Sequence, residues 1–448
     1  MATTASGRVT RTGSPPAVVA ERVLVAVVAV NVVIVWVLFL VEGHQKNTLI
    51  GIGKLIALHL ALILMLQLTL VARLPWLDRR LGMDRLTRWH RWVGFTLLWT
   101  VVLHFTFIVL GFARLDGKPV ADTFLSLAGV TASLVGMFAA ATLVTVAVLS
   151  MRAIRRRLGY ETWHAIHLLM YVAVGLGLYH QFKEGTTFRQ TTLTSAYWWT
   201  LWTLVITALF VGRIGVPLWR NAYHRFSVAE VVPEADDVVS VHVTGRHLDR
   251  LPARAGQFFI WRFPAHNGWW QANPFSMSKA PDGRSLRLTA KAVGTTSAGL
   301  RDLPVGTRAF LEGPYGAFTS LHQRTDGVVL VAGGVGVTPI RSLLEETQGP
   351  AVVLYRVRDE ADAVLLPELR ELAAARGAQV HVLSGRTGAG SPPNRPFDPA
   401  NLAALVPDIT RRDVYVCGPP PMTESVLRSL RELDVPRRQV HAERFSLA

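Results

Sequence analysis

The sequence predicts a multi-domain protein: a six-helix transmembrane bundle, then an antiparallel β-barrel, then a doubly wound α/β domain. Long uncharged runs occur only before about residue 220 of the 448-residue chain, which indicates a membrane half followed by a water-soluble half. In the soluble half, alternating strand-like segments give way near residue 326 to repeated strand, loop and helix segments. We therefore expect domains at residues 1–22, 23–220, 221–325 and 326–448.

Six apolar runs approach the roughly 20 residues that a helix needs to cross a bilayer. They are Val23–Val41, Leu55–Ala72, Trp92–Ala113, Thr123–Met151, Thr162–Phe182 and Gln190–Gly212. The first run is too long for the core of a signal peptide, so we expect it to be retained as a helix.

Lys and Arg residues predict the orientation of the bundle. The N-terminal segment, residues 73–91 and residues 151–161 together hold 13 of them, whereas the three alternate loops hold six. The more basic side of a membrane protein faces the cytoplasm. We therefore expect a multi-pass plasma-membrane protein whose N-terminus and soluble half are both cytoplasmic.

Composition also restricts the partners of the chain. Many of the residues behind the net charge of +16 flank the apolar runs, and no basic stripe with interleaved aromatic residues stands out. We therefore expect no nucleic-acid partner. The single cysteine, Cys417, excludes a disulfide framework, a four-cysteine iron–sulfur cluster and covalent c-type haem within this chain.

Histidines mark the third and fifth apolar runs. His90 and His104 are 14 residues apart, which on a helix is a rise of about 21 Å with both side chains roughly on one face. His167 and His180 are 13 residues apart on the fifth run, which crosses in the same direction. Imidazole pairs would then meet at two depths. Haem iron accepts two axial nitrogens, whereas zinc requires four close ligands, so the pattern favours two b-type haems.

The fifth run leaves one geometric question open. On an ideal helix His167 and His180 lie about 140° apart, so a kink or wide turn at the intervening glycines would be needed to align them. His164 is an alternative ligand, although it lies about 160° from His180. A histidine that only makes polar contacts between helices is the structural alternative, and we prefer it for the isolated His59.

Two loops in the last third of the chain suggest a nucleotide site. In AGGVGVTP, three glycines permit a tight turn after a buried strand, Thr338 can cap the following helix, and Pro339 suits its first turn. The helix dipole would then favour a pyrophosphate, although an ordinary β–α turn explains this loop equally well. In VYVCGPPPM, Cys417 and Gly418 end a strand at the edge where open α/β sheets bind ligands; the structural alternative is a rigid turn.

A third motif, NPFSMS, falls in the barrel half. It predicts an exposed edge strand that could meet a flat ring with backbone and hydroxyl groups. Read alone, it is also an ordinary strand with a proline near its start.

Taken together, the six runs, the two histidine pairs and the motifs NPFS, EGPYG, GGVGVTP and CGPPPM resemble the ferric reductase and NADPH oxidase superfamily. The resemblance covers nearly the whole chain from about residue 20. It implies that electrons pass from cytoplasmic NADPH or NADH through FAD and two b-type haems to an acceptor outside, either oxygen, giving superoxide, or a ferric chelate. Two alternatives stay open: an electron-delivery subunit for a partner protein, and a haem-less membrane anchor on a flavin reductase.

The resemblance also implies roles for individual residues. His90 and His167 resemble the ligands of the inner haem, and His104 and His180 those of the outer haem. The implied FAD-binding residues are Asn273, Pro274, Phe275, Ser276, Lys291, Gly294, Thr296 and Phe445. Asn273 stands where related proteins often have His or Arg. An ordinary core position in the last strand is the alternative for Phe445.

The implied NAD(P)H-binding residues are Gly333, Gly334, Gly336, Thr338, Pro339, Arg356, Arg358, Arg386, Cys417, Gly418 and Pro419. The three arginines follow strands of the α/β domain, where guanidinium groups can bind the 2′-phosphate of NADPH. They favour NADPH over NADH, with simple surface solvation as the alternative.

Overall fold

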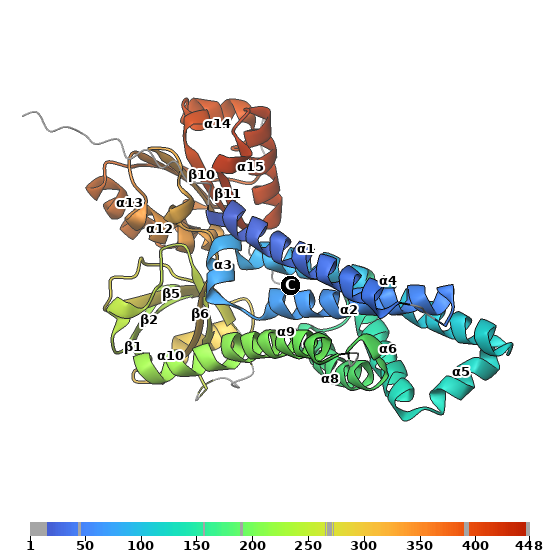
Figure 1. The fold of residues 1–448 in the computed structure, drawn as a ribbon. Coiled ribbons are helices and arrows are strands. Elements are labelled where there is room, and N and C mark those ends of the chain that lie inside the picture. The colour runs from blue at the N-terminus through green and yellow to red at the C-terminus, as the bar shows by residue number, and fades with distance from the viewer. Residues whose placement is uncertain are drawn as a thin grey trace, which may run out of the picture. The chain divides into compact units, whose positions relative to one another are not determined.

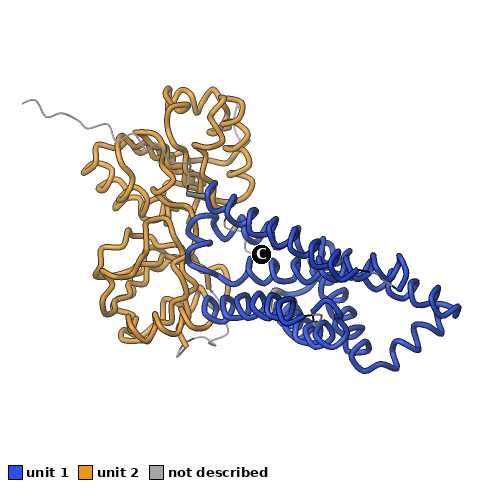
Figure 2. The backbone as a smooth tube through the Cα atoms, viewed as in Figure 1, with its two compact units in different colours: residues 1–213 blue, residues 214–448 orange. Residues whose placement is uncertain are grey.

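The computed structural model describes residues 16–43, 46–155, 157–188, 191–264, 266, 271, 273–388 and 394–444. The chain divides into two compact units, Met1–Arg213 and Ile214–Ala448 (Figure 2). Figure 1 gives the labels of the helices and strands used below.

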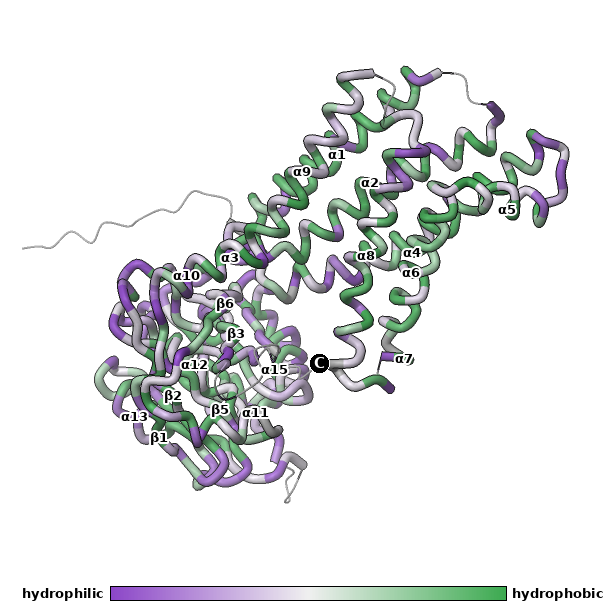
Figure 3. The backbone as a smooth tube through the Cα atoms, turned by 90° about the horizontal axis from the view of Figure 1, so that it is seen from below, coloured by the Kyte–Doolittle hydropathy of each residue, from purple (hydrophilic) through white to green (hydrophobic). Residues whose placement is uncertain are grey.

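Within the described residues, six helices are long and apolar enough to cross a membrane. They begin in α1 (Pro16–Glu42), α2 (Thr48–Val71), α4 (Met83–Asp116), α6 (Thr131–Leu149), α8 (Tyr160–Glu184) and α9 (Thr192–Phe210). The sixth continues through a π-helical turn, Val211–Gly215, into α10 (Val216–His224). Hydrophobic residues dominate these helices in Figure 3, and the prediction of six spans is confirmed.

Short elements connect the spans, and one of them corrects the prediction. The connecting helices are α3 (Pro75–Leu81), α5 (Val120–Ala128) and α7 (Arg152–Arg155), with a 3₁₀ turn at Thr186–Phe188. The fourth run was predicted as one helix from Thr123, but α5 ends before Gly129 and α6 begins at Thr131. The prediction was wrong because Val130 is extended (φ −91°, ψ 116°), a break that apolar composition does not reveal.

Two antiparallel helix pairs form the centre of the first unit: α2 packs along α4, and α6 packs along α8. Glycines allow the helices to approach closely, as in many membrane bundles. A Cβ atom added to Gly53 of α2 would lie 2.9 Å from Ile108, and one added to Gly136 of α6 would lie 2.6 Å from the His180 ring. Larger side chains at these positions would push the paired helices apart.

The first part of the second unit is an antiparallel β-barrel, as predicted. One sheet has the order β1 (Ser227–Ala235), β2 (Val238–Thr244), β5 (Ser285–Lys291), and the other β4 (Asn273–Ser276), β3 (Phe258–Arg262), β6 (Phe310–Tyr315). Isolated bridges, Ser227 to Arg308 and Met277 to Leu288, join the two sheets. Phe259, Trp261 and Met277 lie in the shared core, each at most 1% exposed.

The rest of the unit is a parallel sheet in the order β11-β10-β7-β8-β9. Its strands are β7 (Val328–Gly333), β8 (Ala351–Arg356), β9 (Gln379–Leu383), β10 (Asp413–Gly418) and β11 (Val440–Arg444). The helices α12 (Val337–Glu346), α13 (Leu366–Ala375), α14 (Pro399–Leu405) and α15 (Pro420–Glu432) connect them. The strand order reverses between β7 and β10, and open α/β sheets bind ligands at such a reversal.

A buried carboxylate fixes the segment that leads from the barrel into the sheet. Asp413, fully buried at the start of β10, accepts hydrogen bonds from the amides of Arg324 (2.8 Å) and Thr325 (2.7 Å) and from the Thr325 hydroxyl (2.7 Å). Its other oxygen lies 2.9 Å from His441 Nε2 on β11. Burial opposes the charge, but hydrogen bonds from His441 and Thr325 outweigh it and lower the pKa of Asp413 from its ordinary value of 3.8.

We predict that Asp413→Asn lowers the free energy of unfolding at pH 7 by roughly 1–3 kcal/mol, because charge-assisted hydrogen bonds are lost in a buried site. A lowered carboxyl pKa stabilises the fold above pH 3.8, and this contribution disappears as pH falls through the folded-state pKa. The variant should therefore lose less stability than the wild type on acidification. Thermal unfolding of the full chain at several pH values measures both effects.

Asp408→Asn is the matched control, because Asp408 pairs with Arg412 at 2.7 Å but its side chain is 48% exposed. Exposed pairs contribute about 0–1 kcal/mol, so its unfolding should change little. Equal losses in the two variants would contradict a special role for Asp413.

Candidate functional site

The structure brings His90 of α4 and His167 of α8 together. Their ring centroids lie 6.2 Å apart, and the ring planes are inclined at 69°. Two imidazoles that bind one metal ion from opposite sides have centroids about 6 Å apart, because each metal–nitrogen bond is about 2 Å and each centroid lies about 1 Å beyond its nitrogen. The separation of the pair would therefore suit two imidazoles that hold one metal ion between them.

A serine determines which nitrogen of His167 carries the proton. Ser150, at the end of α6, donates its hydroxyl hydrogen to the carbonyl of Val146 (2.7 Å), so it accepts from His167 Nδ1 (3.3 Å). Nδ1 then carries the proton, and Nε2 keeps the lone pair that a metal needs. The Trp163 ring stacks on His167 at 5.2 Å, which further fixes the imidazole plane.

Both histidines of the second pair form a hydrogen bond through Nδ1, as His167 does. His104 Nδ1 donates to the carbonyl of Gly53 on α2 (3.0 Å), and His180 Nδ1 donates to the carbonyl of Ala132 on α6 (2.8 Å). A carbonyl oxygen can only accept, so both Nδ1 atoms carry the proton and both Nε2 atoms have a free lone pair. The two side chains are close enough to interact electrostatically.

Helix α8 needs no interruption to present its two histidines. It is continuous from Tyr160 to Glu184, so the wide turn expected at its glycines is not formed. His167 and His180 instead both bond to α6 or to the residue that ends it, since rotation about the Cα–Cβ bond redirects each ring. His164 is exposed beside Trp163. His59 bonds to Trp36 and to the carbonyl of Leu55, which fits a structural role.

Two polar residues that lie near His90, namely Gln67 and Arg213, were not identified from the sequence. His90 Nδ1 is buried without a hydrogen bond, although the Gln67 backbone is nearby. Gln67 itself is 8% exposed, and its Oε1 atom has no partner. Arg213, in the π-helical turn, acts electrostatically on His90, and its Nε is also without a partner. The signal available in the sequence was a single glutamine within an apolar run and an arginine at the end of another.

These observations test whether the first unit suits haem. Among the described residues, no group of three or more His, Cys, Asp or Glu side chains is arranged to hold a metal ion. Paired imidazoles suit an iron that a macrocycle already holds on four sides. The unpartnered Arg213 Nε–H beside the first pair is a donor that suits a ligand with acidic groups. The residues present therefore fit haem.

The NPFS segment forms strand β4 at the edge of its sheet, as expected. Phe275 is half-buried, and its carbonyl accepts a hydrogen bond from Trp261 (3.0 Å). The Ser276 side chain is buried, yet its hydroxyl has no partner. Because buried hydroxyl groups nearly always have partners, this edge fits the polar rim of a flavin. Asn273 reaches only the Trp261 carbonyl, at 3.5 Å, and Pro274 is exposed.

The remaining residues assigned to FAD lie elsewhere. Lys291 forms an exposed ion pair with Asp237 (2.9 Å). The amide of Gly294 donates to the Ser297 hydroxyl (3.2 Å) at the start of a short helix. The Thr296 side chain and the whole of Phe445 lie outside the part of the chain that the structure describes.

Glycines at the reversal of the sheet allow two loops to touch. A Cβ atom added to Gly336 would collide with the Cys417 carbonyl, and one added to Gly418 would lie 2.5 Å from Met422 Cε. Gly333 is equally crowded by Met422. Gly334 differs, because its φ is +53° and nothing lies within 4 Å of its Cβ direction. Its backbone is therefore open to a ligand at this edge, beside Pro419, which precedes α15.

The prediction that Thr338 caps α12 is wrong. A 3₁₀ turn, Gly334–Gly336, precedes the helix and makes Gly336 its N-cap, without a side-chain hydrogen bond. Thr338 is thus the second helical residue, and its hydroxyl donates back to the Val335 carbonyl (3.0 Å). Pro339 lies in the first turn, as expected.

The three arginines differ in their surroundings. Arg356 donates to the carbonyls of Val357 (2.9 Å) and Leu383 (2.7 Å), and also to the Gly385 carbonyl. Its burial lowers the pKa of the guanidinium. Arg356 therefore shapes the turn that carries Arg386. Arg358 and Arg386 are exposed at the same edge.

Comparison with known proteins assigns the membrane half and the α/β domain of the chain to two different family models. Residues 55–178 match the family model of the ferric reductase like transmembrane component. Residues 330–428 match that of the oxidoreductase NAD-binding domain. The ferredoxin reductase component of 3-ketosteroid-9-alpha-monooxygenase from Mycobacterium tuberculosis is 32% identical over 237 residues, which is 49% of this chain and 65% of that protein. The chain thus spans less than two thirds of the length of that relative.

Two further proteins are similar to about half of this chain. The reductase component of propane 2-monooxygenase from Mycolicibacterium goodii is 30% identical over 240 residues, covering 50% of this chain and 67% of that protein. The FAD/NAD-binding domain of a Vibrio cholerae nitric oxide dioxygenase is 24% identical, covers 50% of this chain and 98% of its own, and has a TM-score of 0.41.

The fold and the matched segments define a multi-pass membrane oxidoreductase with an FAD- and NAD(P)H-binding module. The chain joins a ferric-reductase-like transmembrane domain to a ferredoxin-reductase-like module. This arrangement matches the fused architecture of the ferric reductase and NADPH oxidase superfamily, which confirms the resemblance seen in the sequence.

We predict that Ser276→Ala weakens FAD binding while leaving the FAD-free protein at least as stable as the wild type. Removing a buried hydroxyl without a partner relieves a desolvation cost. If that hydroxyl bonds to FAD, its loss should raise the dissociation constant roughly 3- to 10-fold, the equivalent of one ordinary hydrogen bond. Titration of flavin fluorescence measures the affinity. Unchanged affinity would show that the hydroxyl does not face FAD.

Proposed function

We propose that this protein carries electrons from cytoplasmic NAD(P)H through FAD and two b-type haems to an acceptor on the other side of the plasma membrane. When bound, the flavin accepts a hydride and releases single electrons, which haem iron carries. We assign residues 23–220 to the haem domain, 221–325 to FAD and 326–448 to NAD(P)H. Oxygen, giving superoxide, and ferric chelates are the acceptors that the family resemblance suggests.

The observation that supports this function most strongly is the hydrogen-bonding pattern of the histidines. Three of the four imidazoles, His104, His167 and His180, donate Nδ1–H to an oxygen and leave Nε2 free. A polar contact between helices would not require the same nitrogen to be free in each case. The separation of His90 and His167 has the value expected for one metal ion between them.

The lipid bilayer supplies the second part of the proposal. The two histidine pairs are separated by about 20 Å along their helices, most of the roughly 30 Å apolar thickness of a membrane. The excess of Lys and Arg in the N-terminal segment and in residues 73–91 and 151–161 supports a cytoplasmic NAD(P)H module. The inner pair is then His90 with His167, and the outer pair His104 with His180.

For the nucleotide we propose NADPH, with NADH as the alternative. Arg358 and Arg386 are exposed at the carboxyl edge of the sheet, and Arg356 holds the turn beside them. Guanidinium groups bind a phosphate through paired hydrogen bonds. The second candidate function is delivery of electrons to a partner protein instead of a small acceptor, because relatives of the soluble half are reductase components of monooxygenases.

Anaerobic reduction of the purified full chain with NADPH tests the function directly. Flavin and haem absorbance should both change to the reduced spectra, and addition of oxygen or ferric citrate should then reoxidise the haem. Reoxidation only in the presence of an added protein would favour the delivery role. Failure of NADPH to reduce any haem would contradict the proposed path.

We predict about two haems per chain in a pyridine haemochrome assay, the number that two histidine pairs can hold. His104→Ala or His180→Ala should remove one haem and leave the other, because each substitution breaks one pair. A colourless membrane unit after haem supplementation would support the haem-less anchor instead.

We predict that Ser150→Ala weakens haem binding at the inner pair by about 10- to 100-fold, the usual cost of losing a group that orients a metal-binding histidine. Without its acceptor, His167 is no longer restricted to one protonation state. Haem titration of the protein and the reduction potential of the inner haem measure the effect.

Thr142→Ala is the matched control for Ser150→Ala. Thr142 lies on the same helix and makes the same bond to the preceding turn, to the Phe138 carbonyl (2.9 Å). Because this bond is exposed and does not involve a histidine, haem affinity should not change. Equal losses in both variants would indicate a general effect on α6.

A further inference from the structure

Helix α12 connects the two ends of the proposed hydride path. It begins at the glycine loop that we assign to the nicotinamide dinucleotide, and its last residues lie against the barrel. The Glu346 carboxylate accepts hydrogen bonds from the Ala255 amide (2.9 Å) and Arg254 (3.2 Å). The Ser342 hydroxyl accepts from the Gly256 amide (3.3 Å). Movement of this helix would therefore move the nucleotide loop relative to the barrel.

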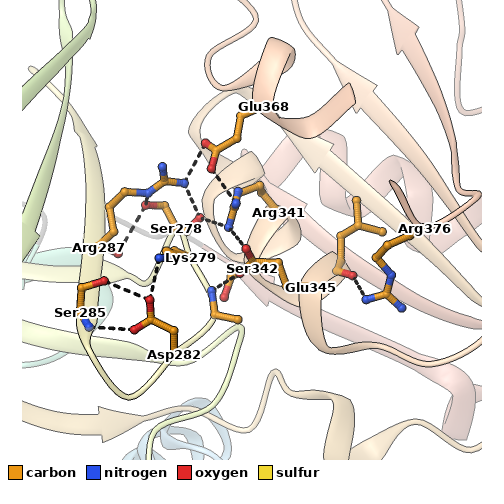
Figure 4. A network of polar contacts seen from close by, with 12 residues as sticks. Ser278, Lys279, Asp282, Ser285, Arg287, Arg341, Ser342, Glu345, Glu368 and Arg376 are labelled. Atoms are coloured by element: carbon orange, nitrogen blue, oxygen red, sulfur yellow. Dashed lines mark hydrogen bonds and ion pairs between the residues drawn. The ribbon is translucent and has the colours of Figure 1, made fainter. Parts of the chain in front are cut away.

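A network of charged side chains ties the same helix to the barrel and to α13 (Figure 4). Arg341 of α12 lies 2.6 Å from one oxygen of Glu368 on α13, and Arg287 of β5 lies 3.0 Å from the other. Arg341 also pairs with Glu345, one turn further along α12, at 2.8 Å. Both arginine side chains are almost buried, at 6% and 7% exposure. A single carboxylate thus bridges two guanidinium groups from different domains.

The network reaches the flavin strand through one residue, Ser278. Its carbonyl accepts hydrogen bonds from both Arg287 (2.8 Å) and Arg341 (3.3 Å), and its hydroxyl accepts one from Arg287 Nε (2.9 Å). Two residues further along the chain, the amide of Ala280 donates a hydrogen bond to Glu345 of α12. Ser278 is two residues beyond Ser276, the buried hydroxyl that fits the flavin. Few bonds therefore separate the flavin edge from the nucleotide helix.

We propose that Arg287, Arg341 and Glu368 are positioning residues that set the nicotinamide at hydride-transfer distance from the flavin. The inference rests on the proposed function. Hydride transfer requires reacting atoms about 3–3.5 Å apart, and a displacement of 1 Å can cost about 100-fold in rate. The planar guanidinium fork holds two partners at fixed angles, which the single flexible ammonium of lysine does not.

The composition of the network, buried ion pairs, is better suited to aligning the two domains than to stabilising the fold. Buried ion pairs contribute little net stability, because desolvation cancels most of the attraction. Arg341 Nε is buried without a partner, which is a further cost. Beside the network, a cleft of about 530 Å³ lies between the end of β1 and residues 360–370. The domains are thus not packed together there, and the side chains of the network bridge them.

Arg341→Lys is the decisive variant, because it keeps the charge and loses the fork. In the full chain with FAD bound, rapid anaerobic mixing with NADPH should show the limiting rate of flavin reduction reduced about 10-fold or more. The NADPH concentration at half the limiting rate should change little, since the nucleotide loop is intact. The long-wavelength absorbance of the nicotinamide–flavin complex should weaken, because it depends on ring overlap. Glu368→Gln removes both ion pairs and should give the same result.

Arg370→Lys is the matched control. Arg370 pairs with Glu360 at 2.6 Å and lines the same cleft, but both side chains are more than half exposed. Its limiting rate should equal that of the wild type. Bound FAD and the thermal unfolding temperature confirm folding in every variant.

The outcomes separate this inference from the proposed function. A wild-type chain whose flavin NADPH does not reduce would refute the proposed function itself. Wild-type rates in folded Arg341→Lys and Glu368→Gln would overturn the positioning role alone. Failure of both variants to fold would also overturn it, because the network would then maintain the fold and not the alignment.

Discussion

The first unit depends on one constraint, which three of its four paired histidines meet: an imidazole inside a bilayer needs an acceptor for the proton of one nitrogen while its other nitrogen stays free. No water is available at that depth, so the donor must find an oxygen on a neighbouring helix. Gly53 and Ala132 provide backbone carbonyls for His104 and His180, and Ser150 provides a hydroxyl for His167. These bonds connect α4 to α2 and α8 to α6, the pairs whose close approach the glycines allow.

In the second unit, closely packed backbone at the strand ends shapes the proposed nucleotide site. Where β7 and β10 end, glycines let two loops approach closely, which leaves Gly334 facing open space. Strand β4, which we propose contacts the flavin, lies at the edge of a different sheet, so the two proposed sites need a fixed relationship. Helix α12 and the Arg287–Glu368–Arg341 network supply it. In both units, buried polar side chains with fixed hydrogen-bond partners orient the residues that we assign to the cofactors.

Much of the fold could be predicted from the sequence, because hydrophobic period and turn residues act locally. The six spans, the barrel strands and the parallel sheet follow from such patterns. The break at Val130 was missed because we read the run by its apolar composition, although Gly129, the C-cap of α5, is a helix-stop signal within it. Thr338 was misplaced as a cap for a different reason: a 3₁₀ turn shifted the start of α12 by a residue or two, and helix ends are decided by small energies.

The sequence by itself determined which residue types are available: four histidines at two spacings, glycines and prolines at two strand ends, and a serine in NPFS. Only the tertiary structure decided what they contact. It turned both α8 histidines towards α6 without a break in the helix, placed Gln67 and Arg213 near His90, and engaged Arg356 with backbone carbonyls. The reason is physical, because side-chain rotation and contacts between distant segments depend on packing that no local pattern encodes.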